Sequence, residues 1–230
     1  YLKRKFKELV FNIHIQDPKS NYSFFDLIIS PEHDQLKKPN NISTLLALHN
    51  ISFDLNKKKT NAINFIIGGS NKYFKFNINT QNQILNDIEF LSKISLVNLI
   101  PSRRTPTQFI KKLVTLKNQN VKLFTNLFDP INYGNLLSES NMQIVTWDSI
   151  SMISEAISSE TGTFLYKFEE ESCPKRYMLF HQMVEQKGYL KNFSKDLKPY
   201  TISMNSYNSD LKSKILNKIE SNLWFKNSVS

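Results

Sequence analysis

The stretch 144–168 constrains the fold of this chain more than any other part of the sequence. It opens with a short apolar run at 144–146, followed by a polar turn that contains Asp148 and Ser149. Apolar residues then recur at helical spacing, Gly162 ends the helix, and a second β-rich run closes the stretch. The pattern predicts a strand, a tight turn, a helix and a strand, which form one βαβ unit with Asp148 or Ser149 as the N-cap.

The predicted turn has the chemistry of an anion site. The first residues of a helix offer free backbone N–H groups and the positive end of the helix dipole, which suit a phosphate. Glu155 lies two turns further into the predicted helix. From there its carboxylate is expected to reach a ribose hydroxyl. The alternative is an ordinary capped helix in an α/β fold.

The composition is that of a globular protein with ample material for a core. The chain has 230 residues, of which 40% are hydrophobic and 22% charged, and its apolar runs are too short to span a bilayer. A single cysteine, Cys173, excludes an internal disulfide framework and fits a reducing compartment. We therefore expect a cytoplasmic protein. Because the chain begins at Tyr1 without a methionine, a targeting segment upstream stays open.

The net charge of +10 raises the question of an anionic partner. The lysines are scattered apart from two small groups at 3–7 and 57–59, in a chain rich in Asn, Ile and Lys. We interpret most of the charge as solvated surface and expect no nucleic-acid partner. A weak peripheral contact with the inner face of a membrane remains open.

Strands and helices alternate along the chain, which predicts doubly wound parallel sheets. A helix end is expected at 2–9, a polar linker at 56–61, and a strand or a short helix at 42–48. The other expected elements are strands at 10–15, 24–30, 62–67, 95–100 and 121–125, and helices at 83–94, 107–116, 133–140, 175–187 and 210–225.

Polar residues follow four of the predicted strands, where ligands bind in parallel sheets. Close-approach glycines, hydroxyls, two guanidinium groups and a helix N-terminus together suit a diphosphate. Each set also has a simpler interpretation, as a tight turn, a solvated basic pair or a polar turn. The four sets are Glu32, His33 and Asp34; Gly68, Gly69 and Ser70; Ser102, Arg103 and Arg104; and Asp148 and Ser149.

Four motifs occur in an order that resembles a known family. They are PEHD at 31–34, IGGS at 67–70, SRRTP at 102–106 and TWDSISMISEA at 146–156, and QDP at 16–18 also fits. Together they resemble the mitochondrial fission family, which is named for the plant elongated-mitochondria protein and is widespread in bacteria. The family is also described as glycosyltransferases of GT-B type. The chain departs from its pattern at Trp147 and Leu46, and it lacks the opening strand, loop and helix of the family's first domain.

The resemblance implies an α/β fold with two Rossmann-like domains of GT-B type, in which parallel sheets are flanked by helices. Residues 1–56 would be the remnant of the incomplete first, acceptor-side domain. Residues 57–230 would form the donor-binding domain, with a final helix that crosses back to the first.

The first functional hypothesis is a glycosyltransferase that uses a nucleoside-diphosphate sugar donor, an unknown glycoconjugate or lipid acceptor, and no cofactor or metal. Cationic side chains and a helix dipole would neutralise the leaving group. The expected donor-site residues are Gly68, Gly69, Ser70, Ser102, Arg103, Arg104, Thr105, Asp148, Ser149, Ser154 and Glu155.

The catalytic base is expected on the acceptor side, at residues 32–34. His33 titrates near neutral pH, and Asp34 or Glu32 would orient its ring. His49 is the competing candidate, because it also follows an apolar run.

The second hypothesis is a binding protein without catalytic activity. The plant relatives suggest this role, because they recruit a dynamin-like fission protein to the mitochondrial surface. The polar residues at the strand ends favour the enzyme, since an adaptor has no physical need for them.

Overall fold

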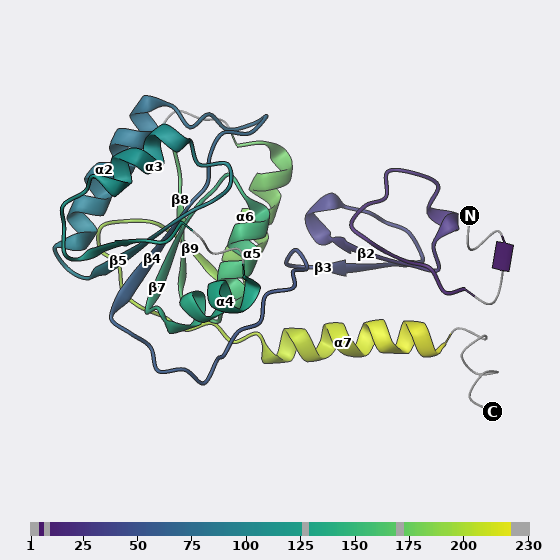
Figure 1. Cartoon of the computed structure of the whole chain (residues 1–230). Helices are drawn as coiled ribbons and strands as arrows, with labels where there is room; N and C mark the ends of the chain where they lie inside the picture. The colour runs from purple at the N-terminus through teal and green to yellow at the C-terminus, as the bar shows by residue number, and fades with distance from the viewer. Residues whose placement is uncertain (1–4, 7–9, 126–128, 169–172, 222–230) are drawn as a thin grey trace. The chain divides into compact units, whose positions relative to one another are not determined.

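The computed structural model describes residues 5–6, 10–125, 129–168 and 173–221. The chain divides into two compact units (Figure 1). The smaller unit consists of Tyr1–Ala47 together with Ser203–Ser230, and the larger unit is Leu48–Ile202. Each unit is built around its own parallel sheet.

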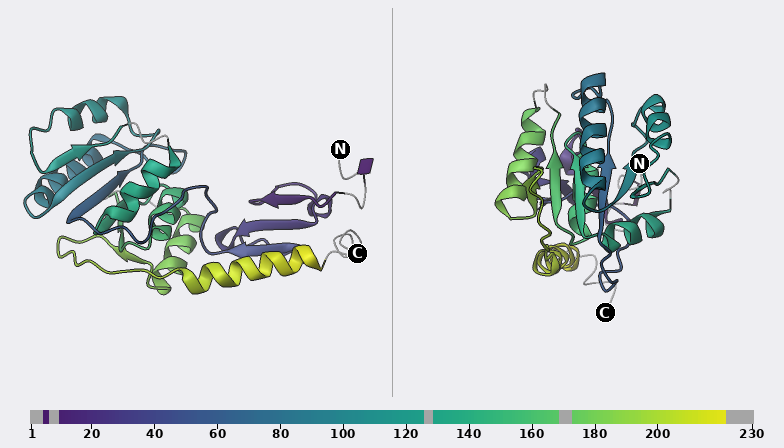
Figure 2. Two further views of the ribbon diagram at one scale, coloured as in Figure 1. Left: turned by 60° about the horizontal axis from the view of Figure 1, so that its bottom comes forward. Right: turned by 90° about the vertical axis from the view of Figure 1, so that its left-hand side faces the viewer.

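The larger unit is a six-stranded parallel sheet with helices on both faces (Figures 1 and 2). The strand order is β6-β5-β4-β7-β8-β9. In chain order the elements are β4 (Ala62–Ile67), α2 (Ile78–Ser92), β5 (Leu96–Pro101), α3 (Thr107–Val114), β6 (Val121–Leu123), α4 (Pro130–Glu139), β7 (Met142–Thr146), α5 (Ile150–Ser158), β8 (Thr163–Tyr166), α6 (Lys175–Gln186) and β9 (Leu190–Asn192).

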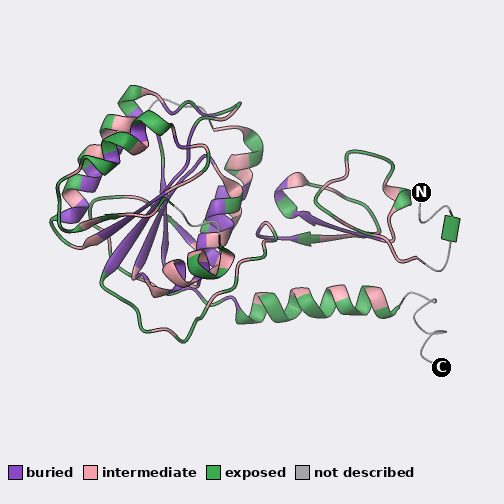
Figure 3. Ribbon diagram, in the orientation of Figure 1, coloured by how far each residue is buried: buried purple, intermediate pink, exposed green. Residues whose placement is uncertain are grey.

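The central strands are buried on both faces, which explains their nearly continuous apolar sequences. Every residue of β4, β7 and β8 is buried (Figure 3). Phe65 of β4 is fully buried and packs against Tyr166 of β8, with ring centroids 5.1 Å apart. The hydrophobic core of this unit therefore extends over both faces of β4, β7 and β8.

Three buried amide side chains interrupt the apolar strands and are paired across the sheet. Asn98 Nδ2 donates to Asn64 Oδ1 at 2.9 Å, and Asn64 Nδ2 donates to Gln143 Oε1 at 3.3 Å. Gln143 Nε2 in turn donates to the Leu137 carbonyl at 2.7 Å. Because each amide needs its neighbour on the next strand, the chain of hydrogen bonds favours one register of β5, β4 and β7.

The smaller unit contains a three-stranded parallel sheet in the order β1-β2-β3 and the last described helix. Only β2 is buried along its whole length. The helix α7 has no buried residue, and the Tyr207 hydroxyl on it accepts a 2.8 Å hydrogen bond from the Leu45 amide. The elements are β1 (Ile13–Ile15), η2 (Tyr22–Phe24), β2 (Leu27–Pro31), η3 (Glu32–Asp34), β3 (Asn41–Thr44) and α7 (Asn205–Glu220).

The predicted strands and helices are confirmed in order, but several boundaries differ: β1 begins at Ile13 instead of residue 10, α2 at Ile78 instead of 83 and α4 at Pro130 instead of 133. The stretch 42–48 contains the strand β3, which is one of its two predicted alternatives, and the sequence pattern does not predict β9. Helix α5 ends at Ser158, before Gly162, because the chain turns at Glu160, whose φ is 56°. Helix α7 begins at Asn205 instead of residue 210. Most of the expected helix end at 2–9, and residues 222–225 of the last expected helix, lie outside the described residues.

The boundaries of the compact units differ from those of the predicted domains, 1–56 and 57–230. The division into these two domains remains a prediction. Residues from Leu48 onward cluster with the larger unit, and residues from Ser203 onward with the smaller. The segment before β4 packs on α4, where a Cβ on Gly134 would lie 1.9 Å from the Ser52 carbonyl oxygen. Among the described helices, none has both the length and the apolar composition needed to cross a membrane.

Candidate functional site

The strand order of the larger unit defines one point where a ligand is expected. From β4 the chain proceeds outward through β5 to β6, then returns to β7 on the other side of β4. The loops after β4 and β7 therefore lead in opposite directions from adjacent strands. In open parallel sheets such a switch point leaves a crevice at the carboxyl ends of the strands, where ligands bind.

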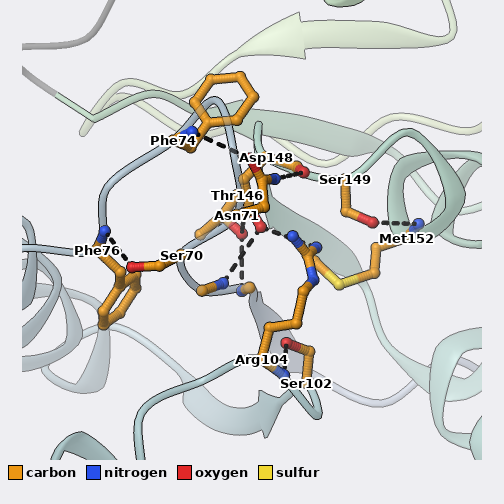
Figure 4. Close-up of polar contacts among 12 residues, drawn as sticks. Ser70, Asn71, Phe74, Phe76, Ser102, Arg104, Thr146, Asp148, Ser149 and Met152 are labelled. Atoms are coloured by element: carbon orange, nitrogen blue, oxygen red, sulfur yellow. Dashed lines mark hydrogen bonds and ion pairs between the residues drawn. The ribbon is translucent and has the colours of Figure 1, made fainter.

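Asp148 ties the loops at this point together (Figure 4). Its side chain is fully buried. Asp148 Oδ1 accepts a 2.6 Å hydrogen bond from the Thr146 hydroxyl, and Oδ2 accepts a 3.2 Å bond from the Gly69 amide. Asp148 Oδ2 also forms a 2.9 Å ion pair with Arg104 Nη2. One carboxylate thus joins residues that follow β4, β5 and β7.

Burial governs the electrostatics of this carboxylate. It raises the pKa of Asp148 above its ordinary value, because desolvation disfavours the charged form. The hydrogen bond from Thr146, the positive charge of Arg104 and the Gly69 amide offset part of this effect by lowering the pKa. The carboxylate therefore depends on these three partners for its charge.

The two glycines after β4 are required by close contacts. A Cβ on Gly68 would lie 2.1 Å from Asp148 Oδ1, and a Cβ on Gly69 would lie 1.9 Å from the Arg104 carbonyl oxygen. Neither position has room for a side chain. The Gly-Gly pair therefore allows the loop after β5 and the Asp148 carboxylate to approach the end of β4.

The turn after β5 is held by hydroxyl groups and presents its arginines at the edge of the sheet. The Thr105 hydroxyl lies 2.7 Å from the Gly68 carbonyl oxygen, and Ser102 Oγ accepts a 3.2 Å bond from the Arg104 amide. The Arg104 side chain is 35% exposed although it is paired with Asp148. Arg103 is exposed, and no hydrogen bond or ion pair joins it to any other residue that the structure describes.

Besides Ser102, the predicted site contains three more serines, and two of them accept hydrogen bonds from backbone amides. Ser149 is the N-cap of α5, and its hydroxyl accepts from the Met152 amide at 3.4 Å, as predicted from the turn. Ser70 is exposed, and its Oγ accepts a 2.9 Å bond from the Phe76 amide. Ser154 is fully buried in α5. Of the three, Ser70 and Ser149 lie in the loops at the switch point.

Glu155 lies on the side of α5 that faces α4. It is half-buried, and burial raises its pKa to about 7, while a hydrogen bond with Tyr133 of α4 lowers the pKa in part. A carboxyl group that titrates near neutral pH is a strong acceptor for hydroxyl groups only when it is ionised. Its expected contact with a ribose stays a prediction.

The expected catalytic base lies in the smaller unit, directly after β2. The His33 side chain is only 1% exposed, and its Nε2 lies 3.8 Å from Asp34 Oδ1. Glu32 is exposed, and the following Gln35 has a φ of 54° that ends the turn. The competing His49 belongs to the larger unit, where its Nδ1 accepts a 3.3 Å bond from the Ile51 amide.

The structure adds site residues that the sequence interpretation did not include. Thr146 donates to Asp148 and accepts from the Gly68 amide at 2.8 Å. Asn71 Nδ2 donates to the Asp148 carbonyl oxygen at 3.0 Å. In the sequence, the feature that points to Asn71 is that a turn-forming residue directly follows Gly-Gly-Ser. In the described residues no group of three or more His, Cys, Asp and Glu side chains is placed to hold a metal ion.

Comparison with known proteins identifies the family. The family described as mitochondrial fission ELM1 matches residues 1–213. The chain belongs to this family. RP120 of Rickettsia prowazekii is 30% identical, over 81% of this chain and 66% of that protein. The mitochondrial fission protein ELM1 of Arabidopsis thaliana is 23% identical, over 84% of this chain and 53% of that protein. This member of the ELM1 family thus spans less than two thirds of the length of either relative.

One solved structure supports the fold. A Listeria monocytogenes protein assigned as a UDP-N-acetylglucosamine 2-epimerase is 13% identical, with a TM-score of 0.51 over 96% of this chain and 62% of that protein. The α/β fold of GT-B type, with parallel sheets flanked by helices, is thereby confirmed. MurG of Acinetobacter baumannii is 9% identical, with a TM-score of 0.44 over 88% of this chain and 54% of that protein.

Proposed function

We propose that this ELM1-family chain binds a nucleoside-diphosphate sugar at the switch point of its larger sheet and takes part in transfer of the sugar to an acceptor. The main support for the proposal is the position of Asp148. The buried Asp148 joins the loops after β4, β5 and β7 and holds the Arg104 guanidinium beside them. The site is thus preorganised for an anion, at the place where open parallel sheets bind ligands.

The charges of the site favour a diphosphate. Arg104 uses Nη2 for Asp148, and a guanidinium has five donors, so others remain for a ligand. Arg103 adds an exposed guanidinium from the same turn. The N-terminus of α5 adds its dipole, with Ser149 as the cap. Two guanidinium groups against one buried carboxylate leave an excess of positive charge for the ligand.

The same groups would assist the chemical step. When a sugar leaves its nucleoside diphosphate, negative charge develops on the departing diphosphate oxygens. Fixed cationic donors stabilise that charge without reorganisation. Arg104, which Asp148 holds in place, and the N-terminus of α5 would supply this stabilisation, and the exposed Arg103 would add its charge on contact with the ligand. A catalytic base at His33, with Asp34 or Glu32, stays a prediction from the sequence.

A binding role is the second candidate function. The Arabidopsis relative, aligned over 84% of this chain, is named for mitochondrial fission. An adaptor needs no anion site, so the presence or absence of nucleotide binding separates the two candidates.

The proposal is tested by nucleotide affinity in a charge-matched pair of variants. The ligands are UDP, ADP and GDP with their sugar conjugates, each titrated calorimetrically into the chain. For any ligand that binds, Arg103→Ala should weaken the affinity about 10- to 100-fold, the effect of losing one charge-assisted hydrogen bond. The control is Lys111→Ala in the last turn of α3, which removes the same charge from an exposed position. Equal affinities in the two variants would refute the assignment of Arg103, and no binding of any ligand would favour the adaptor.

A further inference from the structure

Two tyrosines stand beside the switch-point loops and have no part in the proposed diphosphate contacts. Tyr73 follows the Gly-Gly turn, and its residue surface is 43% exposed. Tyr177 lies in the first turn of α6 and is half-buried. Their ring centroids are 5.8 Å apart, with the planes tilted by 68°. The Lys72 ammonium lies 4.6 Å from the Tyr73 ring centroid. Because a lysine side chain is flexible, it can move aside, and an exposed aromatic ring supported by a second ring is then a surface on which another ring can pack.

Tyr73 is held in place although it is exposed. Asn71 Oδ1 accepts hydrogen bonds from the Tyr73 amide at 2.7 Å and from the Phe74 amide at 3.0 Å. Asn71 is fixed in turn through Asp148, to whose carbonyl oxygen it donates. Phe74, the next residue, is fully buried. The Tyr73 backbone is therefore ordered before any ligand binds, which lowers the entropic cost of using its ring.

Tyr177 connects this aromatic pair to the charged site. Its ring packs against Phe74 with centroids 5.1 Å apart. Burial raises the pKa of the Tyr177 hydroxyl, and the positive charge of Arg104 lowers it in part. The negative charge of Asp148 also raises this pKa. The Tyr177 ring thus packs on the loop that Asn71 joins to Asp148.

The order of the crossover helices separates Glu155 from Tyr177. Helix α5 connects β7 to β8, and α6 connects β8 to β9. Glu155, the residue expected at the ribose, faces α4 through Tyr133. Tyr177 belongs to α6, the next crossover beyond α5. A diphosphate at the start of α5 with its ribose toward Glu155 would thus point its other end toward the tyrosines.

We propose that Tyr73 and Tyr177 form the subsite for the sugar ring of the donor. The apolar C–H face of a pyranose packs on an aromatic ring, and the phenolic hydroxyl of Tyr177 can bond a sugar hydroxyl. The inference rests on the proposed function, and it adds a contact that recognises the sugar part of the donor. The ligand is a hexose attached to a nucleoside diphosphate, and the tyrosines distinguish it from the bare nucleotide.

The test compares each bare nucleotide with its sugar conjugate. Three pairs of ligands are titrated into the wild-type chain and into Tyr73→Ala: UDP and UDP-glucose, ADP and ADP-glucose, and GDP and GDP-mannose. The pair that binds the wild-type chain most tightly is then used for all variants. We expect Tyr73→Ala to weaken binding of the conjugate about tenfold while the affinity for the bare nucleotide stays within about twofold. Tyr73→Phe and Tyr73→Trp keep a ring at this position and should retain conjugate binding.

The control variant is Phe24→Ala, which removes another exposed aromatic ring, one belonging to the smaller unit. Equal losses for nucleotide and conjugate in Tyr73→Ala would place the ring at the nucleotide and overturn the inference. Unchanged binding of both would also overturn it, while the proposed function would stand. If the wild-type chain binds none of the six ligands, the proposed function fails as well.

Discussion

The two sheets of this chain are both parallel, but they differ in how they are covered. In the larger unit every residue of β4 and β7 is buried, whereas in the smaller unit Ile13 and Ile15 of β1 are 42% and 56% exposed. The difference extends to the charged pairs. Asp148 is fully buried against Arg104, while Asp210 and Lys214 form a pair on α7 in which both side chains are more than half exposed.

This difference shows where precise polar geometry can be built. A carboxylate held between covered strands must satisfy each of its hydrogen bonds within the protein, because water does not reach it. Its partners are consequently fixed, and the loops that carry them are fixed too. An exposed pair such as Asp210–Lys214 exchanges its partner for water at little cost. The proposed binding site therefore lies in the larger unit, where a buried charge orders the loops.

The largest expected effect is the loss of stability on removing the buried carboxylate. Asp148→Ala leaves the buried Gly69 amide and Thr146 hydroxyl without their acceptor. We expect the free energy of unfolding to fall by about 2–4 kcal/mol, since each unsatisfied buried group costs about 1–3 kcal/mol. Urea unfolding followed by circular dichroism measures the change.

The matched control for that variant is Asp210→Ala, which removes one carboxylate from the exposed pair on α7. It should leave the unfolding transition nearly unchanged. Similar losses in Asp148→Ala and Asp210→Ala would contradict the contrast between the two units.

A smaller effect is expected from the titration of Glu155. Its pKa is about 7 in the folded chain, against an ordinary value of 4.5. Between these two values the folded state retains a proton that the unfolded state releases, so stability falls as pH rises through this window. We expect a decrease of about 1–3 kcal/mol in the unfolding free energy between pH 4.5 and pH 8 from this group.

Urea midpoints measured across this pH range in wild type and Glu155→Gln isolate that contribution. The variant should lose the pH-dependent decrease, because its amide does not titrate. Glu89→Gln serves as the control, since Glu89 is 69% exposed and paired with Lys93. If the urea midpoint of Glu155→Gln still falls as pH rises, another group causes the loss of stability.

The sequence predicted best those elements whose cause is local. The apolar run 62–67 is the strand β4 with the same boundaries, because both faces of that strand are covered. Strand β9 was missed because it has three residues, of which only Leu190 is buried. Gly162 did not end α5, and its lack of a side chain serves a distant contact instead. A Cβ there would lie 2.4 Å from the Tyr200 carbonyl oxygen.

The candidate site was predictable in its location but not in its internal contacts. The rule that polar residues gather at the carboxyl ends of parallel strands brought Gly68, Gly69, Arg104 and Asp148 into one set. The sequence did not indicate that Asp148 would bind Arg104, since that pairing depends on the adjacency of β4, β5 and β7. Nor did it indicate Tyr73, whose exposure depends on the Asn71 turn.

The central claim is that the switch-point loops of the larger unit hold a nucleoside diphosphate. Hydrogen–deuterium exchange of the chain, with and without a saturating concentration of the tightest-binding nucleotide, tests it most directly. We expect slower exchange in peptides covering 68–71, 102–105 and 148–152, and unchanged exchange in β1 and α7. Protection confined to the smaller unit, with no change at these three loops, would contradict it.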